Sequence, residues 1–192
     1  MNFETENIVY QEITKPLASL EEVLAYQNET VVYEMMDQYD IPFDEAEEIF
    51  TETKKWLWIC ANWHRDYLEG KEIPDLIVTY DLLIIDEMWH TFMLYSFDYT
   101  NFCNNFFGYY LHHQPTPPPF NKIKKMDRPQ GTPGSPFSTS DEIENRITKE
   151  QLEGVLNYIY DLVGGDTINL WYDVYPDKYG IDFFQKKYVK WE

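Results

Sequence analysis

One long helical pattern constrains the fold more than any other feature of this sequence. Between Asp44 and Tyr67, residues suited to burial recur mostly at three- and four-residue steps, which predicts a single amphipathic helix ending near Gly70. Its expected buried positions are Ala46, Ile49, Phe50, Thr53, Trp56, Leu57, Ile59, Cys60, Ala61 and His64. No alternating strand pattern persists for more than a few residues. We therefore predict an all-α protein, a compact orthogonal helical bundle.

Shorter helical patterns lie on both sides of this segment. Ser19 is a predicted N-cap before Leu20, and Asp44 with Glu47 resembles a capping box at the start of the long helix. Further helices are expected over about 80–95, from Ser96 or Asp98 to Phe107 with Gly108 as the stop, from Ser140 with Asp141 to Leu162, and over about 167–174. The helix over 80–95 is apolar nearly all round, which predicts a central, buried position.

Proline divides the chain into three parts. Residues 1–113 are predicted to form a helical core, and 114–140 a long irregular loop that holds most of the chain's 11 prolines and a basic patch. Residues 141–192 are expected to form helices that pack back on the same domain. Because Pro-rich segments dock on aromatic grooves, residues 114–140 predict a protein partner or self-association.

Composition excludes several classes of protein. The chain of 192 residues carries 34 acidic against 15 basic side chains, a net charge of −19, which argues against direct binding of nucleic acid. An aromatic content of 18% argues against a disordered chain. The most apolar run, 76–85, is too short to span a membrane, and the first residues have no secretory pattern. With only Cys60 and Cys103, we expect free thiols and a cytoplasmic protein, although a pairing of the two stays open.

The segment with the richest chemistry begins at Asp86. Asp86 and His90 are four residues apart, so their side chains share one helix face at a separation of about 6 Å. Cys103 falls one helix later, and His113, with His112 as its alternative, follows shortly after. A carboxylate, two imidazoles and a thiolate suit Zn²⁺, and Fe²⁺ is also chemically reasonable. We therefore predict a metal site formed by Asp86, His90, Cys103 and His113.

Each of these residues also has a purely structural interpretation. Asp86 and His90 can form a hydrogen-bonded pair, Cys103 can be a small core residue, and the two later histidines can cap a helix. A cysteine nucleophile, Cys103 with His90 or His113, fits the same residues. Two neighbours have open roles: His64 is a site residue or an interfacial histidine, and Glu87 is a supporting base or an exposed helix position.

The combined motif resembles the glycine-rich domain-containing protein-like family, in particular its uncharacterised bacterial-type members. The resemblance rests on the stretches "FTETKKWLWICA", "DEMWHTFML", "DYTNFC" and "GYYLHHQP", and it covers about residues 50–119. It implies a shared fold and a site at Asp86, His90, Cys103 and His113 rather than a reaction. Two family features are absent: the second histidine of the plant members falls at Phe92, and no glycine-rich region follows.

Three functional hypotheses follow, and the reaction, if there is one, is left open. The first is a helical metal protein that uses the predicted site. The second is an acidic interaction or assembly component that uses the Pro-rich segment and has no catalytic activity. A third, weaker hypothesis is a nucleic-acid mimic, because the stretch from Glu21 to Glu52 is rich in acids and has no Lys or Arg.

Overall fold

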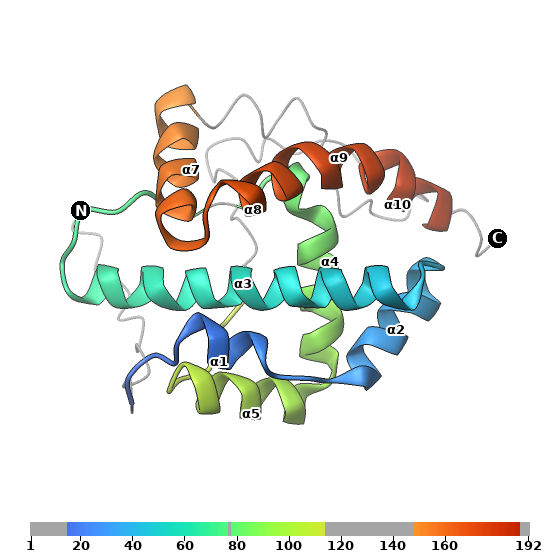
Figure 1. The fold of residues 1–192 in the computed structure, drawn as a ribbon, viewed down its shortest axis with the longest axis horizontal. Coiled ribbons are helices and arrows are strands. Elements are labelled where there is room, and N and C mark those ends of the chain that lie inside the picture. Colours follow the sequence, from blue (N-terminus) through green and yellow to red (C-terminus); the bar gives the residue numbers. More distant parts are fainter. Residues whose placement is uncertain (1–14, 77, 114–147, 189–192) are drawn as a thin grey trace, which may run out of the picture. The chain divides into compact units, whose positions relative to one another are not determined.

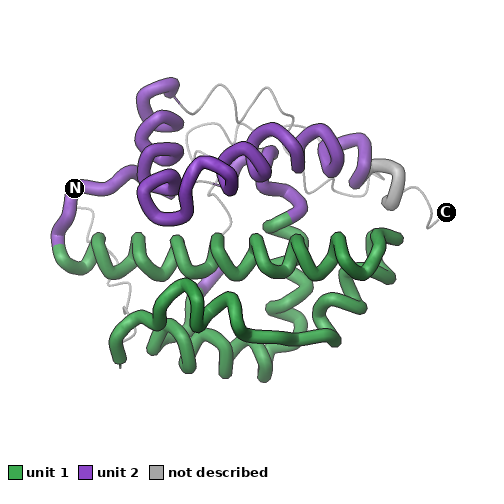
Figure 2. The backbone as a smooth tube through the Cα atoms, viewed as in Figure 1, with its two compact units in different colours: residues 1–69, 85–111 green, residues 70–84, 112–192 purple. Residues whose placement is uncertain are grey.

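A computed structural model describes residues 15–76, 78–113 and 148–188 of the chain. All regular elements within these ranges are helices, so the all-α prediction is confirmed. The described residues divide into two compact units, coloured separately in Figure 2. Unit 1 comprises residues 1–69 and 85–111, and unit 2 comprises residues 70–84 and 112–192. The segment 70–84 thus groups with the C-terminal helices, whereas the Pro-rich segment 114–140 lies outside the described residues.

Unit 1 is organised around the long helix α3. This helix spans Phe43–Leu68, within one residue of the predicted bounds at each end, and contacts α1 (Leu20–Leu24) and α2 (Glu29–Tyr39). Helix α4 (Leu83–Leu94) runs steeply across the direction of α3 in Figure 1, as in an orthogonal bundle. Helix α5 (Ser96–Phe106) completes the unit. The core between them is mainly aromatic, with edge-to-face contacts of Phe92 with Phe50, Tyr99 and Phe102.

The ends of these helices test the capping predictions. Ser19 caps α1 and forms a reciprocal capping box with Glu22, so the predicted cap is confirmed. The predicted capping box at Asp44 is wrong, because Pro42 occupies the N-cap position of α3 and no side chain caps that end. Asp44 lies in the first turn instead, where its negative charge still favours the helix dipole.

A buried lysine joins α3 to the segment between α1 and α2. The Lys54 side chain is 1% exposed, and its Nζ donates hydrogen bonds to the carbonyls of Leu24 (2.8 Å) and Tyr26 (2.7 Å). Carbonyls at a helix C-terminus have no partner within the helix, so the ammonium satisfies groups that α1 leaves open. The same nitrogen lies 5.2 Å from the ring centroid of Phe50, within the range of a cation–π contact.

The predicted helix over 80–95 begins with a 3-10 turn, η1 (Tyr80–Leu82), and continues as α4. As expected, most of α4 is buried, but Leu94 at its end is 78% exposed. Gly108 follows α5 with φ of +82°, and a Cβ on it would lie 2.9–3.1 Å from atoms of Lys15. The predicted stop at Gly108 is confirmed, because both its backbone angle and this close contact require glycine.

Unit 2 contains η1, α7 (Lys149–Val163), α8 (Gly165–Asn169), η3 (Leu170–Val174), α9 (Tyr175–Lys178) and α10 (Ile181–Tyr188). A capping box of Thr148 and Gln151 starts α7, whereas the predicted start at Ser140 and Asp141 lies outside the described residues. Element η3 is a π-helical turn, in which the Tyr175 N–H donates to the Leu170 carbonyl. Pro176 follows directly and has no N–H, so the ordinary helical bond at that position cannot form.

None of the helices within the described ranges combines the length and the apolar character that crossing a lipid bilayer demands.

Candidate metal centre

Helix α4 holds Asp86 and His90 on one turn. The Asp86 Oδ2 and His90 Nδ1 atoms are 3.6 Å apart, and the side chains are 17% and 45% exposed, respectively. Their neighbours Ile85, Met88 and Trp89 are buried, which turns the Asp86–His90 side toward the outside of the helix. The predicted i, i+4 pair is therefore present in the structure, and it lies where solvent reaches it.

His113 brings a third ligand atom to this pair. One ligand atom each from Asp86, His90 and His113 lies within 4.8 Å of the other two. Two ligands bound at about 2.0–2.1 Å to a tetrahedral Zn²⁺ lie about 3.4 Å apart. The Asp86–His90 separation is close to that value, and small side-chain movements would bring the third ligand in.

A chain of hydrogen bonds fixes the backbone that leads to His113. The Trp89 Nε1–H donates to the Tyr99 hydroxyl oxygen (2.9 Å), and the Tyr99 hydroxyl donates to the Leu111 carbonyl (2.6 Å). Both bonds are buried, and Tyr99 is fully covered. Burial is the main reason that the pKa of the Tyr99 hydroxyl is raised far above its usual value, so the hydroxyl keeps the proton that it donates.

These two hydrogen bonds, called the Trp89–Tyr99–Leu111 relay below, give two residues of the motif a structural role. Trp89 is the neighbour of His90 in sequence, and Leu111 precedes the two histidines. Trp89 and Tyr99 lie in the stretches that carry the family resemblance, and the sequence alone gives them no role. Their spacing along the chain does not reveal a hydrogen bond between two helices, so only the tertiary structure identifies them as positioning residues.

Cys103 lies in the core of unit 1 instead. Its side chain is fully buried, and burial is the main reason that the pKa of its thiol rises to about 11. Within the described residues, no group of three or more metal-ligating side chains includes Cys103 or His112. The structure thus brings together three of the four predicted ligands, and it favours His113 over the exposed His112.

The two neighbours with open roles have other surroundings. The ring of His64 packs edge-on against Tyr109 at 4.7 Å between centroids, and burial lowers the pKa of His64 below its usual value. His64 is not among the three grouped residues. Glu87 is half-buried rather than on an open helix face. Its carboxylate accepts a hydrogen bond of 2.6 Å from the Tyr39 hydroxyl, and this bond joins α4 to α2.

Comparison with known proteins places the chain in a family. Residues 23–125 match the UCP032817-like family, a range that covers more than half of the chain and includes Asp86, His90 and His113. The chain belongs to the UCP032817-like family. No curated protein and no solved structure matches it. The family carries no reaction in its description, and the resemblance to glycine-rich domain-containing proteins stays a prediction.

Proposed function

We propose that this protein binds a divalent metal ion through Asp86, His90 and His113. The observation that supports the proposal is the grouping of one ligand atom from each of these side chains within 4.8 Å. The 3.6 Å separation of the first two atoms is close to the spacing of two ligands on one tetrahedral Zn²⁺, which supports the proposal. The reaction, if the metal takes part in one, stays open.

The ligand chemistry narrows the choice of ion. Two imidazoles and one carboxylate form the protein ligands of many catalytic zinc sites, and the same set with open positions suits non-haem Fe²⁺. We propose Zn²⁺ first and Fe²⁺ as the alternative. Cys103 is not a ligand in this proposal, because it lies outside the group of three ligand atoms. A cytoplasmic location belongs to the same proposal, and it is supported by the two free thiols.

Three protein ligands leave at least one coordination position for water or a substrate. The exposure of His90, at 45% of its side chain, gives such a molecule access from solvent. A structural zinc site closes its shell with four protein ligands, so the proposed set of three favours a catalytic centre. The hypothesis of an interaction component that uses residues 114–140 stays a prediction, since that segment lies outside the described residues.

Metal content of the untagged full-length chain tests the proposal. We expect one bound Zn²⁺ or Fe²⁺ per chain by elemental analysis, and a loss of affinity of at least about tenfold in His90→Ala and in His113→Ala. His112→Ala is the matched control, because it removes a neighbouring exposed histidine that is outside the group. Cys103→Ala distinguishes the three-ligand set from the four-ligand set, and we expect it to keep its metal.

Two results would overturn the proposal. One is a wild-type chain that binds neither ion in competition with a chromophoric chelator. The other is an equal loss in His90→Ala and His112→Ala, which would indicate adventitious binding to surface histidines. Circular dichroism of each variant establishes that the helical fold is intact, so that a loss of metal is not a loss of structure.

A further inference from the structure

The outward face of α2 is acidic. Its inward side chains, Val31, Val32, Met35 and Tyr39, are buried, while Glu34 and Asp37 are exposed one turn apart on the opposite face. The sequence from Glu21 to Glu52 has no Lys or Arg, so α2 itself holds no positive side chain. Negative charge on an exposed helix face attracts basic partners over the range of a Debye length.

Two large apolar side chains are exposed beside this face. Leu94, at the end of α4, is 78% exposed, and Phe97, in the first turn of α5, is 79% exposed. Tyr95 lies between them in sequence, and its hydroxyl donates a hydrogen bond of 3.0 Å to Glu34 on α2. Leu94 and Phe97 thus flank a residue that is bonded to the acidic face. Exposed apolar residues next to polar ones are typical of interaction surfaces.

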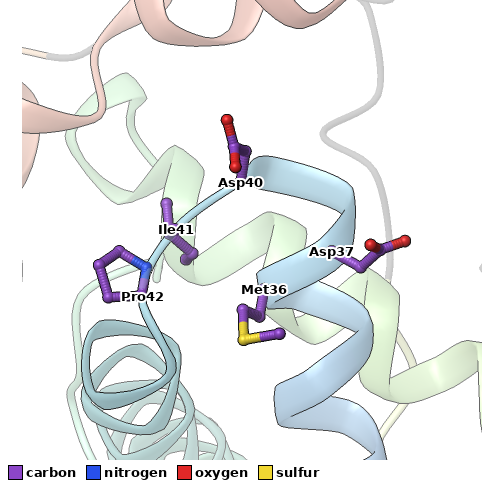
Figure 3. Close-up of a pocket in the computed structure, with 5 residues that line it drawn as sticks. All are labelled: Met36, Asp37, Asp40, Ile41 and Pro42. Atoms are coloured by element: carbon purple, nitrogen blue, oxygen red, sulfur yellow. The ribbon is translucent and has the colours of Figure 1, made fainter.

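A pocket lies at the C-terminal end of the same helix. It measures about 410 Å³ and is lined by Met36, Asp37, Asp40, Ile41 and Pro42. In Figure 3 the apolar side chains lie between the end of α2 and the start of α3, and the carboxylates of Asp37 and Asp40 point outward. Asp40 ends α2 with a left-handed backbone, φ of 53°. An apolar floor with carboxylates at its edge matches a lysine or arginine side chain, which has an aliphatic stem and a cationic end.

We propose that this surface, formed by Glu34, Asp37, Asp40, Leu94 and Phe97 and called the α2 surface below, docks a basic amphipathic segment of a partner protein. Charge complementarity selects the occupant. The acidic residues repel an anionic membrane surface, so they favour a basic protein segment over a lipid surface. A helix that carries Leu on one face and Lys or Arg on the other offers both of the contacts that the α2 surface presents.

The probe for this proposal is a helical peptide of about 15 residues that repeats Leu and Lys in an amphipathic pattern. Its matched counterpart has Glu in place of every Lys. Binding to the ¹⁵N-labelled full-length chain is followed by backbone amide shifts at a salt concentration of about 0.15 M, where remote charges are screened. We expect the Lys peptide to shift amides of α2 and of the α4–α5 junction, and the Glu peptide to shift none.

Two pairs of variants separate the α2 surface from general charge and general apolarity. We expect Glu34→Gln/Asp37→Asn/Asp40→Asn to weaken binding of the Lys peptide at least about tenfold, whereas Glu72→Gln/Asp75→Asn/Asp161→Asn, with the same change in charge, leaves it nearly unchanged. We expect Leu94→Ser/Phe97→Ser to weaken it similarly, whereas Tyr160→Ser/Val174→Ser, which also removes exposed apolar side chains, does not.

Three results would overturn the proposal. The first is no binding of the Lys peptide to the wild-type chain. The second is equal weakening by the control variants, or amide shifts spread over the whole chain, because either outcome would mean unspecific attraction between opposite charges. The third is binding of the wild-type chain to vesicles that contain anionic lipid but not to the peptide, which would identify a membrane as the occupant.

Discussion

Lys54 makes the stability of this protein depend on pH in an unusual direction. The ammonium is buried, and burial is the main reason that its pKa falls from 10.5 to about 8, with the charge of Glu47 opposing the change. In the unfolded chain the same side chain titrates near its ordinary value. Between these two pKa values the unfolded state therefore holds more protons than the folded state, so stability rises as the pH increases through this window.

The size of the effect follows from the two pKa values. The whole difference between the two pKa values corresponds to at most about 3 kcal/mol in the free energy of unfolding. The part of this stability gained between about pH 7 and about pH 9.5 is at most about 2 kcal/mol. At pH 7 the group is charged in both states, and its hydrogen bonds to Leu24 and Tyr26 offset part of the cost of burial. At pH 9.5 the folded protein holds the neutral amine, which still donates hydrogen bonds.

The test compares the wild-type chain with Lys54→Met, which keeps a long, unbranched side chain and removes the titrating group. Urea unfolding at the two pH values gives four free energies of unfolding, and comparison of the variants cancels the titration of the tyrosines, which both proteins share. We expect the wild type to gain up to about 2 kcal/mol relative to Lys54→Met as the pH rises.

Lys149→Met is the control, since Lys149 is an exposed lysine whose side-chain Nζ lies 3.5 Å from Glu153 on the surface of α7. We expect its stability to follow that of the wild type at both pH values. If Lys54→Met also follows the wild type, the reasoning about the buried ammonium is refuted.

Three further predictions concern unit 1. Tyr99→Phe removes both hydrogen bonds of a buried hydroxyl, so we expect a loss of about 2 kcal/mol in urea unfolding, and a loss below about 0.5 kcal/mol would contradict the relay. Gly108→Ala should lower the free energy of unfolding by at least about 1 kcal/mol more than Gly70→Ala. Both glycines have positive φ, but only Gly108 has atoms close to an added Cβ, and equal losses of stability in the two variants would count against this reasoning. Burial raises the pKa of Cys60 to about 12 and that of Cys103 to about 11. We therefore expect neither thiol to react with Ellman's reagent at about pH 8 until urea unfolds the chain. Rapid labelling of the folded chain would contradict this prediction.

Local pattern was enough to predict α3, α4 and α5. The apolar spacing of α3 fixed its bounds closely, because a helix of this length has many turns that agree on one face. The capping box at Asp44 failed because Ile41-Pro42 already sets the backbone at that end, and a cap depends on one residue rather than on an averaged pattern. The π-helical turn before Pro176 has no periodic signature either.

The candidate site was predictable to a different degree at each residue. Asp86 and His90 share one helix, so their spacing alone places them together. Cys103 lies on another helix, and periodicity indicates which residues of α5 share a face but not which part of α4 that face meets. Lys54 was not predicted, because the carbonyls that bind its ammonium lie about 30 residues earlier in the chain, where no sequence pattern connects them to it.

The Trp89–Tyr99–Leu111 relay couples the packing of unit 1 to the proposed centre. The Leu111 carbonyl accepts the last hydrogen bond of the relay, and His113 follows two residues later. This coupling is reciprocal. If the ordered relay strengthens binding of the ion, the bound ion stabilises the relay by the same free energy. A substitution such as Tyr99→Phe would therefore lower metal affinity without touching a ligand, and saturating metal would restore part of the lost stability. The aromatic core that sets this protein's fold would then also set the affinity of the proposed centre for its ion.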